Sequence, residues 1–190
     1  MTTKKPFALL TTLVLAIHVT ACDPLPTERR DLAPIEITTT RPDAAMPYGP
    51  GFEHLANKGP ETVATAAMEH LCTFTAAEYD AMTVHERLQG ITTPKAWRAV
   101  TADPSTITPH MILRSWDTWD RAGGTQRAEV TISNEIHPED SDTTWHRKMA
   151  CTRIMDGFDE IFIDDFVVIL EKNRGQWRID HLSLLSSVFT

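Results

Sequence analysis

The chain has 190 residues, 42% of them hydrophobic, and a formal net charge of −8 at pH 7. This length and composition predict a single globular core. The acidic balance argues against nucleic acid as a partner and against added adhesion to anionic lipid.

The N-terminal segment has the features of an export signal. Lys4 and Lys5 precede an apolar stretch over residues 7–19, which is too short for a membrane span of about 20 residues. The sequence Val19-Thr20-Ala21-Cys22 resembles the bacterial lipoprotein box, in which the cysteine is acylated and becomes the mature N-terminus. The resemblance implies a lipoprotein signal peptide over residues 1–21 and a lipid anchor on Cys22. An ordinary signal peptide with an incidental cysteine is the alternative.

This segment decides where the protein works. Residues 1–21 carry two lysines and no acid, so their removal would take the net charge from −8 to −10. A lipid on Cys22 would hold the protein firmly at a membrane, because two or three acyl chains anchor far better than one. We therefore expect a membrane-anchored protein on the extracytoplasmic face.

Residues 22–59 are predicted to form a Pro/Thr-rich tether. They contain half of the chain's 12 prolines and the run Thr38-Thr39-Thr40, with almost no apolar periodicity. Such a segment stays extended and would display the domain away from the bilayer. Asp23, directly after the lipid cysteine, resembles the signal that retains some lipoproteins in the inner membrane of two-membrane bacteria.

Cys72 and Cys151 are the two cysteines that remain if Cys22 carries lipid. Disulfides persist outside the cytoplasm, so we expect these two to be bonded. Two unrelated buried thiols are the alternative. In the chain-entropy treatment, closing a loop of about 80 residues contributes roughly 4 to 5 kcal/mol.

The folded domain is predicted to span residues 60–190. Pro60, with an acid beside it, suits the first position of a helix. Apolar residues then recur on one helical face over about fifteen residues: Val63, Ala67, Leu71 and Phe74. Cys72 lies on the opposite flank, so either this helix is covered on two sides or the disulfide ties its flank to a strand. Shorter helical stretches are expected over residues 79–88 and from Pro94 onward.

After Pro109 the pattern predicts strands. Five segments are rich in β-branched or aromatic residues and are separated by turn signals: 111–119, 127–137, 144–155, 161–172 and 176–185. In the second, alternating apolar residues mark a half-buried strand: Ala128, Val130, Ile132 and Ile136. In the fourth, the inner face is expected to hold Phe162, Phe166, Val168 and Leu170. Helices followed by an antiparallel meander predict an α+β fold.

The last hairpin is similar to that of a known superfamily. An apolar run over residues 166–170 leads through a turn to Gly175-Gln176-Trp177-Arg178-Ile179. With the long opening helix, two short helices and a curved antiparallel sheet, residues 60–190 resemble the nuclear transport factor 2-like cone. The resemblance implies N-terminal helices packed on the curved sheet. Actinobacterial lipoproteins and the membrane-anchored assembly proteins of conjugative type IV secretion systems present such domains outside the membrane.

Enzymes of this superfamily place a carboxylate or a His–Asp pair inside the cone, beside a tyrosine or second acid. The residues of these types are Asp165, Asp180, His181, His146 and Tyr79. Asp180 and His181 are adjacent on a strand and so point to opposite faces. Asp165 is the better catalytic candidate, but we expect it to face solvent on the outer side of its strand. We therefore predict a protein without catalysis, and keep an isomerase or dehydratase acting in the cone pocket as the rival.

Metal and cofactor sites are not expected. The acidic turn over residues 137–142 lacks the spacing and the glycine of a calcium loop. The histidines are scattered without ligand spacing, and there is neither a glycine-rich phosphate loop nor a nucleophile elbow. We predict no metal ion and no cofactor.

Tryptophans are the remaining candidates for a binding surface, because tryptophan is frequent at interface hot spots and in apolar pockets. Core filling is the alternative, and we prefer it for Trp97 and Trp177. Trp116 and Trp119 are three apart, so on a strand they would face opposite ways and leave one available for binding. The sequence thus predicts a lipid-anchored domain that binds another protein, with a small apolar ligand as the alternative.

Overall fold

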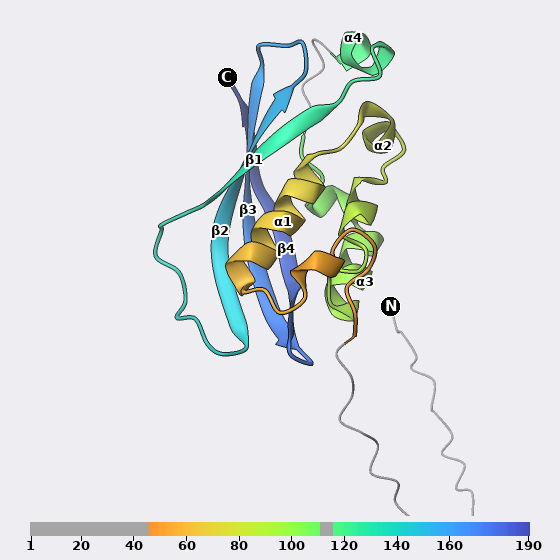
Figure 1. Cartoon of the computed structure of the whole chain (residues 1–190). Coiled ribbons are helices and arrows are strands. Elements are labelled where there is room, and N and C mark those ends of the chain that lie inside the picture. Colours follow the sequence, from red (N-terminus) through yellow and green to blue (C-terminus); the bar gives the residue numbers. More distant parts are fainter. Residues whose placement is uncertain (1–45, 111–115) are drawn as a thin grey trace, which may run out of the picture. The chain divides into compact units, whose positions relative to one another are not determined.

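The computed structural model describes residues 46–110 and 116–190. Cys22, the predicted signal peptide and residues 23–45 of the predicted tether lie outside these residues. The described chain contains one four-stranded antiparallel sheet with the strand order β1-β2-β3-β4. The helices lie on one face of this sheet (Figure 1). The fold is α+β, as the sequence predicts.

The helical elements precede the sheet in the chain. They are η1 (Glu53–Leu55), α1 (Pro60–Cys72), α2 (Ala76–Asp80), η2 (Val84–Leu88), α3 (Pro94–Ala102), η3 (Pro104–Thr106) and α4 (Trp116–Arg121), where η denotes a 3-10 helix. The strands are β1 (Gln126–Ile132), β2 (Thr144–Met155), β3 (Ile161–Asn173) and β4 (Gln176–Phe189).

Helix α1 lies against the inner face of the sheet and is held there in two ways. Its buried residues come from both of its flanks: Val63, Ala64, Ala67, Met68, Leu71 and Cys72. The structure also joins Cys72 to Cys151 of β2 by a disulfide, with the two Cα atoms 6.5 Å apart. Both alternatives considered for this helix are therefore realised, and the disulfide pairing is the one expected from the sequence.

Residues 46–59 pack on the domain, which corrects the predicted boundary at Gly59. Tyr48, Phe52 and Leu55 are buried in the main core, and the Tyr48 hydroxyl donates to the carbonyl oxygen of Trp177 at 2.6 Å. These apolar residues are spaced four and three apart, as on a helix, but only Glu53–Leu55 forms a short 3-10 helix. Their burial depends on contacts with residues far along the chain, such as Trp177.

The predicted first strand, over residues 111–119, needs correction in its second half. Residues 111–115 are outside the described residues, and Trp116–Arg121 forms helix α4. Because residues three apart share one side of a helix, Trp116 and Trp119 point the same way instead of to opposite faces.

The other four strands lie close to the predicted segments. β2 has the predicted bounds, and the predicted inner residues of β3 are all buried: Phe162, Phe166, Val168 and Leu170. β1 stops at Ile132, so Ile136 lies beyond the strand and is fully exposed. β4 extends to Phe189, past the predicted end at Leu185.

Candidate functional site

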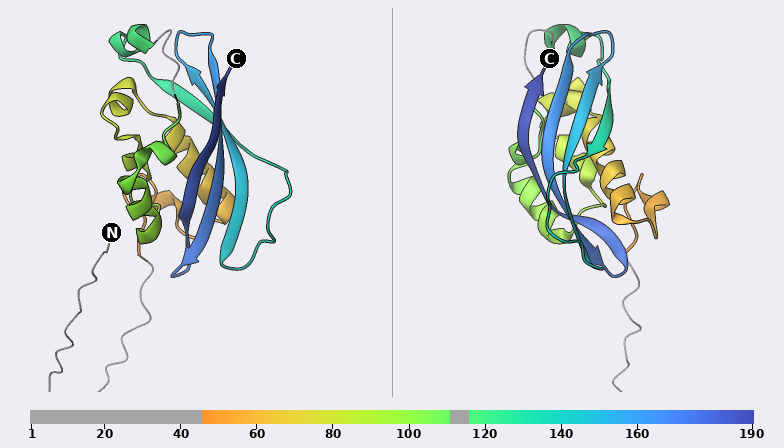
Figure 2. Two further views of the ribbon diagram at one scale, coloured as in Figure 1. Left: turned by 180° about the vertical axis from the view of Figure 1, so that it is seen from behind. Right: turned by 90° about the vertical axis from the view of Figure 1, so that its left-hand side faces the viewer.

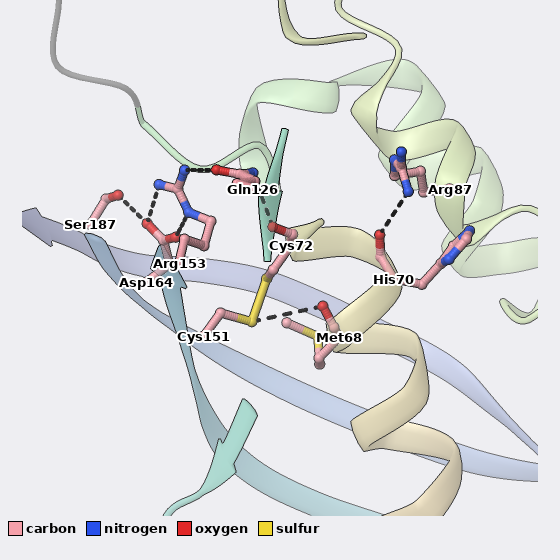
Figure 3. Close-up of a disulfide and its surroundings, with 9 residues drawn as sticks. All are labelled: Met68, His70, Cys72, Arg87, Gln126, Cys151, Arg153, Asp164 and Ser187. Carbon is pink, nitrogen blue, oxygen red and sulfur yellow. Dashed lines mark hydrogen bonds and ion pairs between the residues drawn. A yellow bond between two sulfur atoms is a disulfide. The ribbon is translucent and has the colours of Figure 1, made fainter. Parts of the chain in front are cut away.

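The acid that points into the interior from β3 is Asp164, one residue before the predicted candidate. Asp164 forms an ion pair with Arg153 of β2, and both side chains have 0% exposure. The Arg153 Nε donates to Oδ2 of Asp164, and Nη2 donates to Oδ1 at 3.3 Å (Figure 3). The pair is therefore a two-point contact between neighbouring strands in the core.

The remaining polar atoms of this pair also have partners. Arg153 donates to Oε1 of Gln126 and to the carbonyl oxygen of His110, each at 3.3 Å. Gln126 in turn donates to the carbonyl oxygen of Cys72 at 3.0 Å, next to the disulfide. The Ser187 hydroxyl donates to Asp164. The cluster links the end of α1 to all four strands, which is the arrangement of a structural network.

Aromatic rings enclose the same guanidinium. Its central carbon lies 4.8 Å from the ring centroid of Phe162 and 5.3 Å from that of Phe74. Cation–π contacts of this kind gain strength away from water. Because both carboxylate oxygens of Asp164 accept from donors of the chain, we assign the cluster to stability instead of proton transfer.

The sequence contains a pattern that indicates this buried pair, although Asp165 was selected from it as the catalytic candidate. Asp164 has the same strand parity as Phe162 and Phe166, and Arg153 has the parity of Cys151 and Met155. Alternation alone therefore places both charges on the inner face. Two opposite charges on inner positions of adjacent strands indicate a buried pair.

Asp165 and Asp180, the two candidate catalytic carboxylates, contact residues outside this cluster. Asp165 lies on the outer side of β3, as expected, where it accepts from the Ser186 hydroxyl at 3.0 Å and lies 3.8 Å from Nζ of Lys148. Asp180 accepts from the Thr93 hydroxyl at 3.0 Å and from Lys95 at 2.6 Å. Since Thr93 caps the N-terminus of α3, Asp180 fixes that helix to β4.

The structure does not gather the predicted catalytic types in one place. Asp165 is paired in register with Ser186, six residues along β4 from Asp180. His181 is exposed and His146 is half-buried. Tyr79 packs on aromatic rings, with its centroid 5.8 Å from Phe74 and 4.9 Å from Trp116.

The predicted binding tryptophans are core residues, which corrects their assignment. Trp116 is 9% and Trp119 is 0% exposed, and their ring centroids are 5.0 Å apart. They pack in a second core cluster with Ala76, Met155 and Phe162. The indole nitrogen of Trp119 donates to the carbonyl oxygen of Thr125 at 3.2 Å, so its N–H group has a hydrogen-bond acceptor inside the domain.

The outer face of the sheet is the surface that these corrections leave for binding. No helix of the described chain lies on it, as both views in Figure 2 show. The strand registers bring aliphatic side chains together there: Ala150, Ile154, Ile161, Ile163, Val167, Ile169 and Val188. These side chains are half-buried or exposed. The face is therefore apolar at many positions that an uncovered sheet usually fills with polar residues.

Two hollows on the helical side of the described residues are small or polar. One of 220 Å³ lies between α3 and β4, below the roughly 300 Å³ at which ligand pockets usually begin. Another of 430 Å³ runs beside α1 and is lined by charged residues that include Lys58, Glu61 and Glu69. Neither combines the size and the apolar lining that a small apolar ligand needs.

Two general features can be reported for residues 46–110 and 116–190. No helix there has the length and apolar character needed to cross a bilayer, and no three His, Cys, Asp or Glu side chains there are grouped to hold a metal ion. Comparison with known protein families, curated proteins and solved structures finds no match for this chain.

Proposed function

We propose that this chain is a lipid-anchored extracytoplasmic domain of the nuclear transport factor 2-like type, which binds protein through the outer face of its sheet. The observation that carries the proposal is the composition of β3. Its inner positions face the helices, and four of its outer positions are aliphatic as well, namely Ile161, Ile163, Val167 and Ile169, with the charged Asp165 between them. Strands that are apolar on both faces are typical of sheets covered on both sides.

Binding through this face does not require an exposed tryptophan. An interface core needs aliphatic or aromatic side chains that lose contact with water on association. In the described part of the chain the tryptophans are buried or half-buried, whereas the outer face of β3 and β4 presents β-branched residues to solvent. Binding is therefore a property of the sheet, and the domain would act as a binding or scaffolding part of a cell-envelope assembly.

Anchoring is tested by replacing the acylated residue. Cys22→Ser removes the thiol that carries the lipid, so we expect loss of lipid labelling and release of the protein from membranes. Retention in the membrane fraction at the wild-type level would contradict the anchor and, with it, the proposed location.

Binding is tested with a photo-crosslinking amino acid placed on one face at a time. Val188 lies on the outer face and is 52% exposed, while Met82 lies on the helical side and is 49% exposed. We expect protein adducts in the cell envelope from position 188 and few from position 82. Equal yields at the two positions, or none at position 188, would refute binding through the sheet.

A further inference from the structure

We infer that the loop between β1 and β2 is a recognition element in its own right, which inserts Ile136 into an apolar pocket of a partner protein that carries basic side chains at its rim. This goes beyond the proposed function, because it names a contact outside the strands and the chemistry of the surface that receives it. The apolar tip of the loop, its fixed shape and its unpaired acids lead to this inference.

Ile136 lies where it contributes nothing to the fold. It is 104% exposed, whereas the other exposed large apolar side chains of the described chain are between 36% and 54% exposed. The loop projects on the side of the sheet opposite the helices (Figures 1 and 2). Single exposed apolar residues are common on protein surfaces, but a fully exposed side chain leaves water only when another molecule covers it.

Side-chain contacts fix the loop on both sides of Ile136. Before it, the backbone N–H of Glu135 donates to the Ser133 hydroxyl at 3.1 Å, and Nζ of Lys148 lies 3.2 Å from the Glu135 carboxylate. After it, Arg147 donates to both carboxylate oxygens of Asp140, each at 2.7 Å. Such two-point pairs between arginine and a carboxylate restrict geometry as well as adding energy.

The turn into β2 is fixed as well. Pro138 locks its own φ angle. The Ser141 hydroxyl accepts from the backbone N–H groups of Thr143 and Thr144, at 3.2 and 2.9 Å. A binding loop that is already ordered loses little conformational entropy on association, so the domain presents Ile136 as a preformed contact.

The charges of the loop specify the receiving surface. Residues 133–143 contain four acids and neither lysine nor arginine. Two of these acids are paired as described above, whereas the exposed Glu139 and Asp142 have no ion pair within the described part of the chain. Lysine or arginine around a pocket for Ile136 would complement these two carboxylates. The same charges would repel an anionic lipid surface, which favours a protein as the partner.

Photo-crosslinking from the loop tests the contact in the cell envelope. The crosslinking amino acid replaces Asn134, an exposed residue near Ile136, and the linked molecule is identified by mass spectrometry. We expect adducts with one other protein. No adducts, adducts with lipid alone, or adducts only with a second copy of this acidic chain would overturn the inference.

Substitutions then test the apolar and the charged contacts separately. Ile136→Ser should lower the adduct yield by at least about tenfold, as for a hot-spot side chain, and Ile136→Leu should keep most of it. Replacing Glu139 and Asp142 by Lys should lower the yield more than replacing them by Gln and Asn, because basic rim residues repel lysine. A yield that Ile136→Ser or the two lysines leave unchanged would overturn the inference.

Met82→Ser is the matched control, because Met82 is an apolar residue on the helical side that is 49% exposed. It should leave the yield from position 134 unchanged. Ile136, Glu139 and Asp142 are all exposed, so their variants should melt at the wild-type temperature, and a loss of adducts then reports lost contact instead of unfolding.

The fixed shape of the loop has its own test. Asp140→Ala removes the two-point ion pair with Arg147 but leaves Ile136, Glu139 and Asp142 in place. We expect a lower adduct yield from position 134, because the loosened loop must be ordered again on binding. A yield equal to that of the wild type would refute the preformed contact.

The loop and the sheet give distinguishable outcomes. Adducts from position 188 on the outer face, with none from position 134, would keep the proposed function and refute the inference. Adducts from position 134 that require Ile136, with none from position 188, would support the inference and refute binding through the sheet.

Discussion

Replacing Asp164 by Asn should remove a large part of the stability of this domain. The substitution keeps the shape of the side chain but leaves the guanidinium of Arg153 without its counter-charge, at a site where both side chains have 0% exposure. Removing one partner of a buried ion pair costs about 3 to 5 kcal/mol. That is a major fraction of the roughly 5 to 15 kcal/mol that holds a typical domain folded.

Asp165→Asn is the matched control, because it makes the same chemical change one residue further along β3. The Asp165 side chain is 30% exposed, and its contact with Lys148 is long at 3.8 Å. Exposed pairs contribute about 0.2 to 1 kcal/mol, so the two neighbouring substitutions should differ by several-fold in their effect on the free energy of unfolding.

The measurement is equilibrium unfolding in guanidinium chloride with the disulfide intact, followed by tryptophan fluorescence and circular dichroism. The double variant Arg153→Met with Asp164→Leu removes both charges and should recover most of the loss, because an apolar replacement of a buried pair is often neutral or stabilising. If Asp164→Asn costs no more than Asp165→Asn, the reasoning about the buried pair is wrong.

Three other outcomes are expected. Replacing Cys72 and Cys151 together by Ala should lower the free energy of unfolding by about 2 to 5 kcal/mol, because the unfolded chain gains the freedom of the opened loop; equal stability of the oxidised and reduced protein would contradict this. Burial alone raises the pKa of Glu78, but hydrogen bonds from Arg87 and Thr75 outweigh it and hold the pKa below its ordinary 4.5. The stabilisation from Glu78 is therefore full above pH 4.5 and is lost as pH falls through the depressed pKa. Acid should lower the melting temperature of the wild type more than that of Glu78→Gln. Parallel plots of melting temperature against pH for the two proteins would refute the lowered pKa. Gly124→Ala places a Cβ inside van der Waals contact with the indole ring of Trp119 and should cost about 1 to 3 kcal/mol by overpacking, so an unchanged melting temperature would show that the ring moves freely.

Local periodicity predicted the parts of the fold that depend on it. The bounds of β2 and the inner residues of β3 follow from the strand period of two, and both agree with the structure. The helical period of 3.6 correctly placed Val63, Ala67 and Leu71 on the buried side of α1, while Phe74 lies beyond its end at Cys72. The pairing of Cys72 with Cys151 was also predictable, because removal of Cys22 from the count leaves one possible bond.

Helix α4 and Gly124 show where local patterns end. The segment Trp116–Arg121 is short, so its intrinsic preference is weak, and burial of both tryptophans against Met155 and Phe162 decides that it is helical. Gly124 is typical of a turn, yet glycine is required at this position because the ring atoms of Trp119 leave no room for a Cβ.

The sequence by itself determined the class of the fold, the disulfide and the expectation of a lipid on Cys22, because each depends on residue type and short-range spacing. Alternation along β3 also separates the inner Asp164 from the outer Asp165. Only the tertiary structure shows that Arg153 of the neighbouring strand pairs with Asp164, and a buried carboxylate is tolerated only with such a partner. Only the tertiary structure, likewise, left the aliphatic outer face of β3 without a covering helix among the described residues. Which face of a strand is covered depends on where the rest of the chain packs, and the alternation of side chains along the strand carries no record of that.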